Sequence, residues 1–272
     1  MMENYRSFYE EVGEKYPEED LVYRSLRGRL RRRFVSEWLL SGSGRFLDVG
    51  CNRGMYLHSY ENGPKMGVDL SFAVLQRARE KGEFPLVVAD AQRLSCLRPG
   101  SFDLVLCSEV LEHVSTPADV IWGIQAVLAP GGRALLTTPN YRSRKPEWVE
   151  TGLLKTYGIR GVHGERYFHT AFRPEELAAM GEEAGLTVVE RGTLEKEIKY
   201  AAKLPALLFI VSRFLNRRML RSPAWSRLNQ EMLDRLTVWI HQILRMWRLD
   251  GFLNRLVSEG VRSFVILEKP AL

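Results

Sequence analysis

The stretch RFLDVGCNRGMYLHSY, residues 45–60, has two glycines directly after an apolar run. Gly50 and Gly54 allow a tight backbone turn, and a ligand can approach them closely because glycine has no Cβ. At the carboxyl edge of a parallel sheet, such a turn is where a nucleotide-like ligand binds. A dinucleotide site would need the pattern G-x-G-x-x-G, but position 55 is Met and no phosphate-binding lysine follows. The turn therefore favours a ligand without phosphate.

Polar residues follow the next apolar runs at the points where strands would end. Asp69 comes about twenty residues after the turn, which suits a carboxylate that accepts hydrogen bonds from both ribose hydroxyls. Asp90 is positioned to accept a hydrogen bond from an adenine amino group, with Ala91 and Gln92 as neighbouring contacts. Ser108 ends the fourth run, where we expect the reacting centre.

These residues require a frame of alternating strands and helices. The expected strands are 45–49, 65–69, 85–89, 102–107 and 133–138, and the expected helices between them are 54–61, 72–82 and 117–128. This alternation predicts an α/β fold with a parallel sheet. Pro174 begins a further helix, and two more strands are expected over 187–192 and 261–270.

About 67 residues separate those last two strands, far more than a usual connection. Residues 232–249 have apolar side chains at helical spacing. Residues 204–220 start apolar on all sides and finish basic. We therefore predict an inserted helical lobe over residues 194–260.

Charge and composition limit the classes of protein. The 272 residues carry a net charge of +6, and 45% of them are apolar. Residues 196–258 hold twelve Lys/Arg against four acids, a local charge of +8. Three scattered cysteines without a Cys-x-x-Cys pair predict neither a disulfide frame nor a zinc site. There is no run of eighteen apolar residues, so we expect a cytoplasmic protein without a spanning helix.

Five motifs occur in order: FLDVGCNRG, GVDLS, ADAQRLS, FDLVLCSEVLEHV and LAPGGRALLTTPN. Together they resemble a class I S-adenosylmethionine-dependent methyltransferase, similar to the methyltransferase type 11 and ubiquinone-pathway methyltransferase families. The resemblance implies a Rossmann-like seven-stranded sheet, mostly parallel, whose antiparallel last strand lies between the fifth and sixth. The expected parts are N-terminal lid helices over 1–40, the catalytic domain over 41–193 and 261–272, and the inserted lobe.

The resemblance also implies contacts with the cofactor, S-adenosylmethionine. The methionine end would contact Asp48, Gly50, Asn52 and Gly54; the ribose would contact Asp69 and Leu70; the adenine would contact Asp90, Ala91 and Gln92; and Ser108 would flank the sulfonium. The family more often has glycine where Asn52 stands.

Three histidines are candidate general bases, because neutral imidazole titrates near working pH. They are His113, His163 and His169, and each has a purely structural role as its alternative. Glu109, Glu112 and His113 resemble the divalent-metal positions of ubiquinone-pathway O-methyltransferases, but the same string occurs in relatives that need no metal, so we predict no metal. Tyr9 and Tyr16 resemble residues of an N-terminal lid helix, for which a surface helix is the alternative.

The residues after the fourth strand partly limit the acceptor. Amino methyltransferases of nucleic acids in this class carry Asn/Asp-Pro-Pro-aromatic there, whereas this chain has CSEVLEH. We therefore expect a small-molecule acceptor and no nucleic-acid partner. The alternatives are a dinucleotide-dependent oxidoreductase and a non-catalytic S-adenosylmethionine-binding module.

The basic lobe leaves two hypotheses open. An amphipathic helix, an apolar-to-basic segment and three tryptophans are typical of a helix that lies on an anionic membrane surface. Residues 196–258 would then contact the inner face of the membrane, and the acceptor would be lipophilic. The alternative is a helical cap whose apolar faces pack on each other and on the sheet. The sequence predicts no particular oligomeric state.

Overall fold

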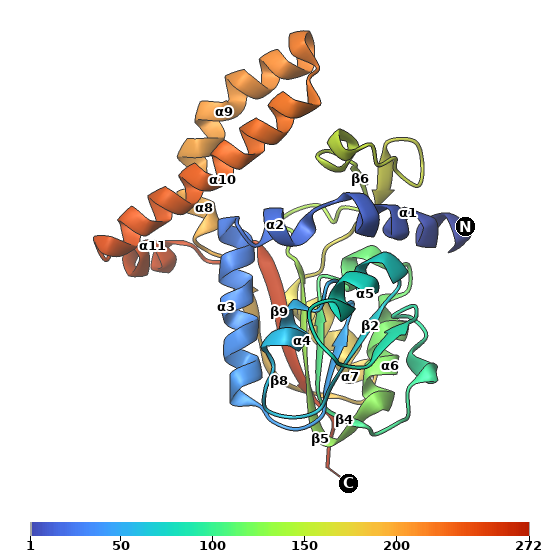
Figure 1. The fold of residues 1–272 in the computed structure, drawn as a ribbon. Helices are drawn as coiled ribbons and strands as arrows, with labels where there is room; N and C mark the ends of the chain where they lie inside the picture. Colours follow the sequence, from blue (N-terminus) through green and yellow to red (C-terminus); the bar gives the residue numbers. More distant parts are fainter. Residues whose placement is uncertain (1, 272) are drawn as a thin grey trace.

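A seven-stranded sheet forms the centre of the molecule (Figure 1). The computed structural model describes residues 2–271, with side chains from residue 5 onward. The strand order is β3-β2-β1-β4-β5-β9-β8. The strands are β1 Phe46–Val49, β2 Lys65–Asp69, β3 Leu86–Val88, β4 Phe102–Ser108, β5 Leu128–Pro139, β8 Thr187–Leu194 and β9 Arg262–Glu268.

The position of β9 confirms the predicted topology. β1 to β5 pair in parallel, whereas β9 pairs antiparallel with β5 on one side and with β8 on the other. In this register Leu135 lies opposite Ile266, and Gly192 lies opposite Phe264. The predicted fold class, a Rossmann-like sheet with an antiparallel strand between the fifth and sixth, is therefore confirmed.

Helices cover both faces of the sheet because its side chains alternate between two apolar clusters. Leu104, Leu106 and Leu135 point to the face covered by α3, α4 and α5. Val105 and Leu136 point to the face covered by α6 and α7. These helices are α3 Leu26–Ser41, α4 Met55–Ser59, α5 Phe72–Arg79, α6 Pro117–Val127 and α7 Pro174–Glu183.

Two N-terminal helices cross the carboxyl ends of the strands, α1 Met2–Lys15 and α2 Glu18–Val22 (Figure 1). Glu10 on α1 accepts hydrogen bonds from the backbone N–H groups of Phe72 and Ala73, at 2.8 and 2.9 Å, and so caps α5. Of the segment expected as a lid, α1 and α2 cover the sheet edge. In contrast, α3 packs Val35 and Leu39 into the core.

Four helices lie between β8 and β9, and two of them form a hairpin that projects from the body (Figure 1). The helices are α8 Ile198–Ala201, α9 Lys203–Leu215, α10 Pro223–Met246 and α11 Asp250–Leu256. A π-helical turn, Asn216–Leu220, follows α9. We call residues 203–246 the hairpin. Among residues 2–271, no helix is long and apolar enough to cross a membrane.

Several predicted boundaries were wrong. The helix expected over 232–249 spans Pro223–Met246. It begins earlier because the Ser222 hydroxyl caps it by accepting a hydrogen bond from the N–H of Trp225. Strand β5 begins at Leu128 rather than at residue 133. A small antiparallel pair, β6 Trp148–Glu150 and β7 Arg166–Phe168, was not predicted. Short 3-10 turns cover Leu94–Cys96, Leu111–His113 and Leu154–Tyr157.

Candidate active site

A cavity of about 850 Å³ lies at the carboxyl ends of the parallel strands, beneath α1 and α2. Most of the residues predicted for the site line it: Asp48, Gly50, Asn52, Asp69, Leu70, Asp90, Ala91, Ser108, His113 and His169. Three predicted residues do not: Gly54, Gln92 and His163.

The turn over residues 50–54 has the left-handed backbone conformations that its glycines suggest. Gly50 has φ +74°, and a Cβ there would lie 2.3 Å from Cγ2 of Val110. Asn52 has φ +48°, a left-handed conformation that asparagine tolerates better than most residues. Its N–H donates to Oδ2 of Asp69 at 2.9 Å, and its side-chain amide donates to Glu18 of α2. Asn52 therefore maintains the turn and ties it to α2.

A buried carboxyl, Asp48, and a half-buried one, Asp69, lie beside this turn. Asp69 accepts hydrogen bonds from the N–H groups of Asn52 and Ser71, and burial raises its pKa to about 6. Burial, with a smaller contribution from the charge of Asp69, raises the pKa of Asp48 to about 8. Oδ2 of Asp48 has no hydrogen-bond partner among the described residues. An orphaned buried acceptor next to an open turn fits a ligand that brings a donor or a positive charge.

The residues that do not line the cavity have other contacts. Gln92 donates from its N–H and its side chain to Asp90, and its Oε1 accepts from Thr116, so it orients Asp90. Gly54 adopts φ +74° at the start of α4. His163 is exposed and packs on Trp148, with ring centroids 4.8 Å apart. His163 is therefore remote from the cavity.

A carboxyl and two imidazoles meet at the end of β4. Glu112 is 1% exposed, and burial raises its pKa to about 8. The rings of His113 and His169 lie 4.9 Å apart. Burial, then the charge of His169, lowers the pKa of His113 to about 3, and burial also lowers the pKa of His169. Glu112 Oε2 and both Nδ1 atoms lack hydrogen-bond partners among the described residues. At neutral pH both imidazoles are therefore neutral, while Glu112 titrates near working pH.

The same three residues are the metal-binding candidates of the described chain. Each of Glu112, His113 and His169 offers a ligand atom, and these atoms lie within 4.8 Å of one another. One carboxylate and two imidazoles are donor types that a divalent transition metal accepts. The sequence motif suggested Glu109 in place of His169. In the structure Glu109 instead forms an ion pair with Arg31 at 2.5 Å.

Glu109 belongs to an ion network that sequence reasoning missed. It has φ +63°, a strained conformation for glutamate, and it accepts a hydrogen bond from Thr137 Oγ1 at 3.1 Å. Arg262 of β9 pairs with Glu109 and, through Nε, with Glu195 at 2.7 Å. Because the partners lie on α3, directly after β4 and β8, and on β9, no local sequence signal identifies the network.

Aromatic rings close the cavity on the lid side. Tyr9 and Tyr16 both line it, as does Tyr167 of β7. Tyr9 lies 5.5 Å from the ring of His113, and Phe8 stacks on Tyr167 at 5.2 Å. Such rings give a flat apolar surface beside the polar cluster, which suits a planar acceptor.

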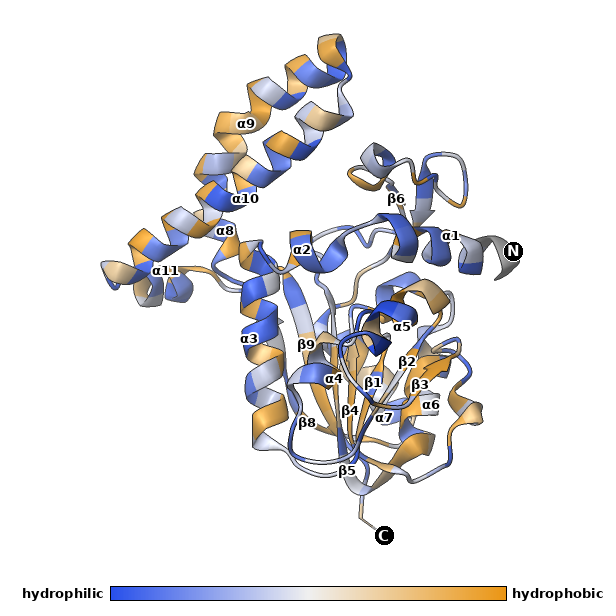
Figure 2. Ribbon diagram, in the orientation of Figure 1, coloured by the Kyte–Doolittle hydropathy of each residue, from blue (hydrophilic) through white to orange (hydrophobic). Residues whose placement is uncertain are grey.

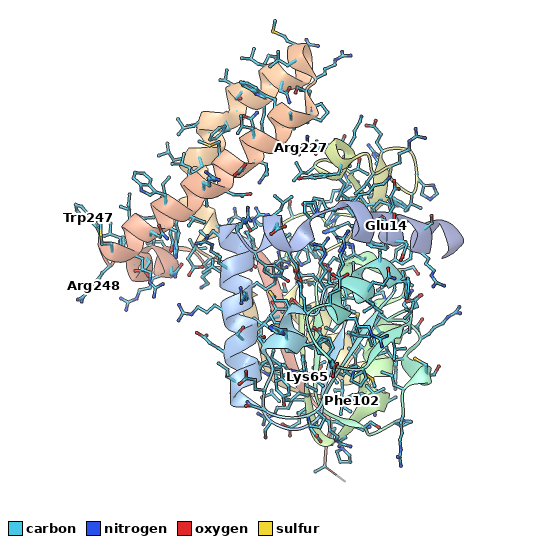
Figure 3. The ribbon with its side chains drawn as sticks, viewed as in Figure 1. Glu14, Lys65, Phe102, Arg227, Trp247 and Arg248 are labelled. Atoms are coloured by element: carbon cyan, nitrogen blue, oxygen red, sulfur yellow. The ribbon has the colours of Figure 1, made fainter. Side chains whose placement is uncertain are left out.

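The hairpin contributes the remaining wall. Its cavity-lining side chains are mostly polar: Ala206, Arg213, Arg227, Gln230, Glu231, Leu233, Asp234 and Thr237. Arg227 reaches from α10 toward the β6 region, where it donates to the carbonyl of Thr156 at 3.0 Å and lies over the ring of Tyr157 (Figure 3). The cavity therefore depends on the hairpin for one side.

Comparison with known proteins agrees with this geometry. Residues 22–191 match a family model described as a methyltransferase domain. The chain is 32% identical over 166 residues to the ubiquinone biosynthesis O-methyltransferase of Aeromonas salmonicida, covering 56% of this chain and 68% of that protein. It is 34% identical over 173 residues to the protein of that name from Thiobacillus denitrificans, covering 59% and 72%.

Solved structures share the fold at lower identity. The 1,6-didemethyltoxoflavin-N1-methyltransferase of Burkholderia thailandensis, solved with S-adenosylhomocysteine, has a TM-score of 0.53 at 20% identity, covering 70% of this chain and 80% of that one. The cyclase SpnF also has a TM-score of 0.53, at 17% identity, covering 88% and 81%. At these identities the likeness concerns the fold alone.

Proposed function

This chain belongs to the class I S-adenosylmethionine-dependent methyltransferases, and from that membership we propose that it methylates a hydroxyl oxygen of a small, lipophilic acceptor. S-Adenosylmethionine is its cofactor. The dinucleotide-dependent oxidoreductase is not favoured. The choice of oxygen is supported by the names of the relatives, which are O-methyltransferases of ubiquinone biosynthesis.

The proposed cofactor contacts follow the strand ends. Asp48 with the Gly50–Gly54 turn would hold the methionine end, and the orphaned oxygen of Asp48 supports this assignment. Asp69 and Leu70 would hold the ribose, Asp90 and Ala91 the adenine, and Ser108 would flank the sulfonium. When bound, S-adenosylmethionine would supply a methyl group on a positively charged sulfur. The acceptor oxygen would attack the methyl carbon in line with the carbon–sulfur bond, and S-adenosylhomocysteine would leave.

The observation that carries the choice of a hydroxyl acceptor is the cluster of buried Glu112 with half-buried His113 and His169. A hydroxyl acceptor must lose its proton, and a base with a pKa near working pH serves best. We assign that role to ionised Glu112, because burial raises its pKa to about 8. His113, whose pKa is lowered to about 3, would be a weak base. The two neutral imidazoles would orient the acceptor by hydrogen bonding. Were a divalent cation bound, Glu112, His113 and His169 would hold it, and it would polarise the acceptor oxygen.

The first experiment measures binding and transfer together. Calorimetric titration should detect S-adenosylhomocysteine and no NAD(P). Purified protein with labelled S-adenosylmethionine should then methylate catechols and phenols with alkyl tails, in preference to matched amines. The same assay with a metal chelator added should show unchanged methylation activity. NAD(P) binding would overturn the family assignment for the site, and exclusive methylation of amines would overturn the choice of oxygen.

The remaining parts of the proposal concern the molecule as a whole. We propose an N-terminal segment over residues 1–40 in which α1 and α2 form the lid, a catalytic domain over 41–193 and 261–272, and an inserted helical lobe over 194–260. We also propose a cytoplasmic location at the inner face of the membrane. A non-catalytic binding module remains the rival, and it predicts cofactor binding without labelled product from any fraction of a lipid extract.

A further inference from the structure

The outer surface of the hairpin is apolar and exposed, as the hydropathy colouring of α9 in Figure 2 illustrates. Leu207 and Val211 of α9 are 64% and 63% exposed, and Met219 in the turn is 75% exposed. The other large apolar side chains that are exposed here are Leu204, Leu208, Ile210, Phe214, Leu215, Leu220, Trp225, Leu228, Met232, Trp239 and Met246. Val238 and Ile240 of α10 pack against Leu26 and Ile198. The exposed side chains named above lie outside that contact, so a cap with covered apolar faces does not describe this outer surface.

The buried residues of the hairpin are mostly polar. They are Asn229 and Thr237 of α10 and Asn216 of the π-helical turn, together with Pro205 of α9. Ser212 Oγ donates to Asn229 at 2.9 Å, and Asn216 donates to Ser226 at 2.8 Å, so both bonds join the two helical arms. This arrangement inverts the usual one of water-soluble proteins, in which leucines are buried and asparagines exposed. Polar contacts between helices that expose leucine are typical of helices packed in lipid.

Positive charge lies at both ends of the apolar surface. Arg217 and Arg218 are exposed in the turn at the tip. Trp247 and Arg248 project from the opposite end of α10, away from the sheet (Figure 3). Exposed Phe252 and Leu256 of α11 continue the apolar surface at that end. Tryptophan and arginine at the margins of an apolar helix surface suit the boundary between acyl chains and headgroups.

We propose that the hairpin docks on the surface of an anionic lipid bilayer, with its apolar surface at the headgroup boundary and its arginines against lipid phosphates. Helix α9 has 13 residues, about 20 Å, so it would enter the boundary without crossing the bilayer. A second copy of this chain fits less well, because it would bring a second local charge of +8 against the first. Anionic lipid complements that charge.

Docking of the hairpin would also place the bilayer beside the cavity. Arg213, Arg227 and Asp234 of the hairpin line the cavity, while Leu207 and Val211 face outward. A docked hairpin therefore holds one wall of the cavity next to the bilayer. This part of the inference rests on the proposed function, because it names the source from which the lipophilic acceptor would enter.

Vesicle sedimentation tests the docking. Full-length protein should sediment with vesicles of phosphatidylcholine and phosphatidylglycerol at low salt, and this binding should weaken at high salt. The double variant Arg217→Glu, Arg218→Glu should lower the partition coefficient at least about tenfold. The variant Leu207→Gln, Phe214→Gln should also lower it, because it removes exposed apolar area without touching the core. The matched control is Arg79→Glu, Arg98→Glu, which makes the same charge change on exposed positions of the catalytic domain and should bind like wild type.

Three outcomes would overturn the proposal. They are wild-type protein that stays in the supernatant at low salt, equal binding to vesicles of phosphatidylcholine alone, and a dimer in ultracentrifugation that the Leu207→Gln, Phe214→Gln variant abolishes. Titration with S-adenosylhomocysteine accompanies each variant. Retained cofactor binding with lost vesicle binding separates failure of docking from failure of the proposed function.

Discussion

At the scale of residues, the site depends on carboxyls that are buried before any ligand arrives. Asp48, Asp69 and Glu112 all have raised pKa values because burial disfavours their charged forms. Such groups cost stability in the free protein and interact strongly with whatever donor or cation binds beside them. Asp48 and Asp69 lie at the ends of β1 and β2, and Glu112 lies in the 3-10 turn after β4, which is consistent with one site for cofactor and acceptor.

Asp69→Ala should weaken S-adenosylhomocysteine binding by about 1–3 kcal/mol, because it leaves buried ribose hydroxyls without an acceptor. The loss also removes the bonds from Asn52 and Ser71 that orient the turn. Calorimetry measures the change. Asp119→Ala, an exposed carboxylate on α6, is the control. Unchanged affinity in Asp69→Ala would remove the ribose assignment.

Glu112→Gln should lower kcat for a hydroxyl acceptor about 100-fold or more if Glu112 is the base. At saturating cofactor, wild-type kcat should rise with pH through about 8, because the carboxylate must be ionised to accept a proton. The variant should show a flat profile. A wild-type profile without this rise, or a variant that keeps it, would assign the base elsewhere.

The same substitution should change stability in a pH-dependent way. The pKa of Glu112 is raised from 4.5 to about 8, so the folded state holds this proton more tightly than the unfolded state does. Its contribution to stability is therefore full below about pH 4.5 and is lost as the pH rises through about 8. Glu112→Gln should be more stable than wild type at pH 9, by a few kcal/mol at about 1.4 kcal/mol per pKa unit, and similar at pH 4. Urea unfolding at both pH values measures this.

At the scale of elements, hydrogen bonds join α1, α2 and the residues between them to the loops proposed to bind the cofactor. Glu10 caps α5, Glu18 accepts from Asn52, and the Tyr16 carbonyl accepts from Arg53 at 2.9 Å. Tyr5 donates from its hydroxyl to the carbonyl of His113. The N-terminal helices therefore contact both the turn after β1 and the turn that holds His113. Displacement of α1 should change the affinity for the cofactor.

Gly13→Leu should displace α1, because a Cβ at Gly13 would lie 2.6 Å from Ser71 Oγ and 2.8 Å from Val74 Cγ1. We expect an S-adenosylhomocysteine dissociation constant about tenfold higher, and faster tryptic cleavage at Lys15. Gly251→Leu is the matched control, since a Cβ there meets nothing within 4 Å. If binding and proteolysis are the same in both variants, the lid does not control the cofactor site.

At the scale of the molecule, the last strand holds the sheet together. β9 pairs with both β5 and β8, and six of its seven residues are buried. A chain that ends at residue 260 lacks this strand and should lose cooperative thermal unfolding. A chain that ends at residue 269 keeps Lys269, which donates to the carbonyls of Gln125 and Leu128, and should unfold like the full chain. Cooperative unfolding of the shorter chain would contradict this.

The sequence by itself determined the seven strands of the sheet and the main helices between them, and most of the site residues that it predicted line the cavity. This was feasible because apolar periodicity marks the strands, and because the polar residue that follows each parallel strand must lie at one edge of the sheet. The Gly50–Asn52 turn, Asp69, Asp90 and Ser108 all follow that rule. The place of the antiparallel strand followed from the family resemblance.

Only the tertiary structure decided what depends on contacts between distant segments. Glu109 faces Arg31 and Arg262 instead of joining Glu112 and His113, and His169 takes its place beside them. In the hairpin, periodicity marked amphipathic helices but not which face packs inward, because that depends on the partner helix. The structure buries Asn216 and Asn229 and exposes most of the leucines, among them Leu207. No one-dimensional pattern contains that choice, since burial is a property of the assembled elements.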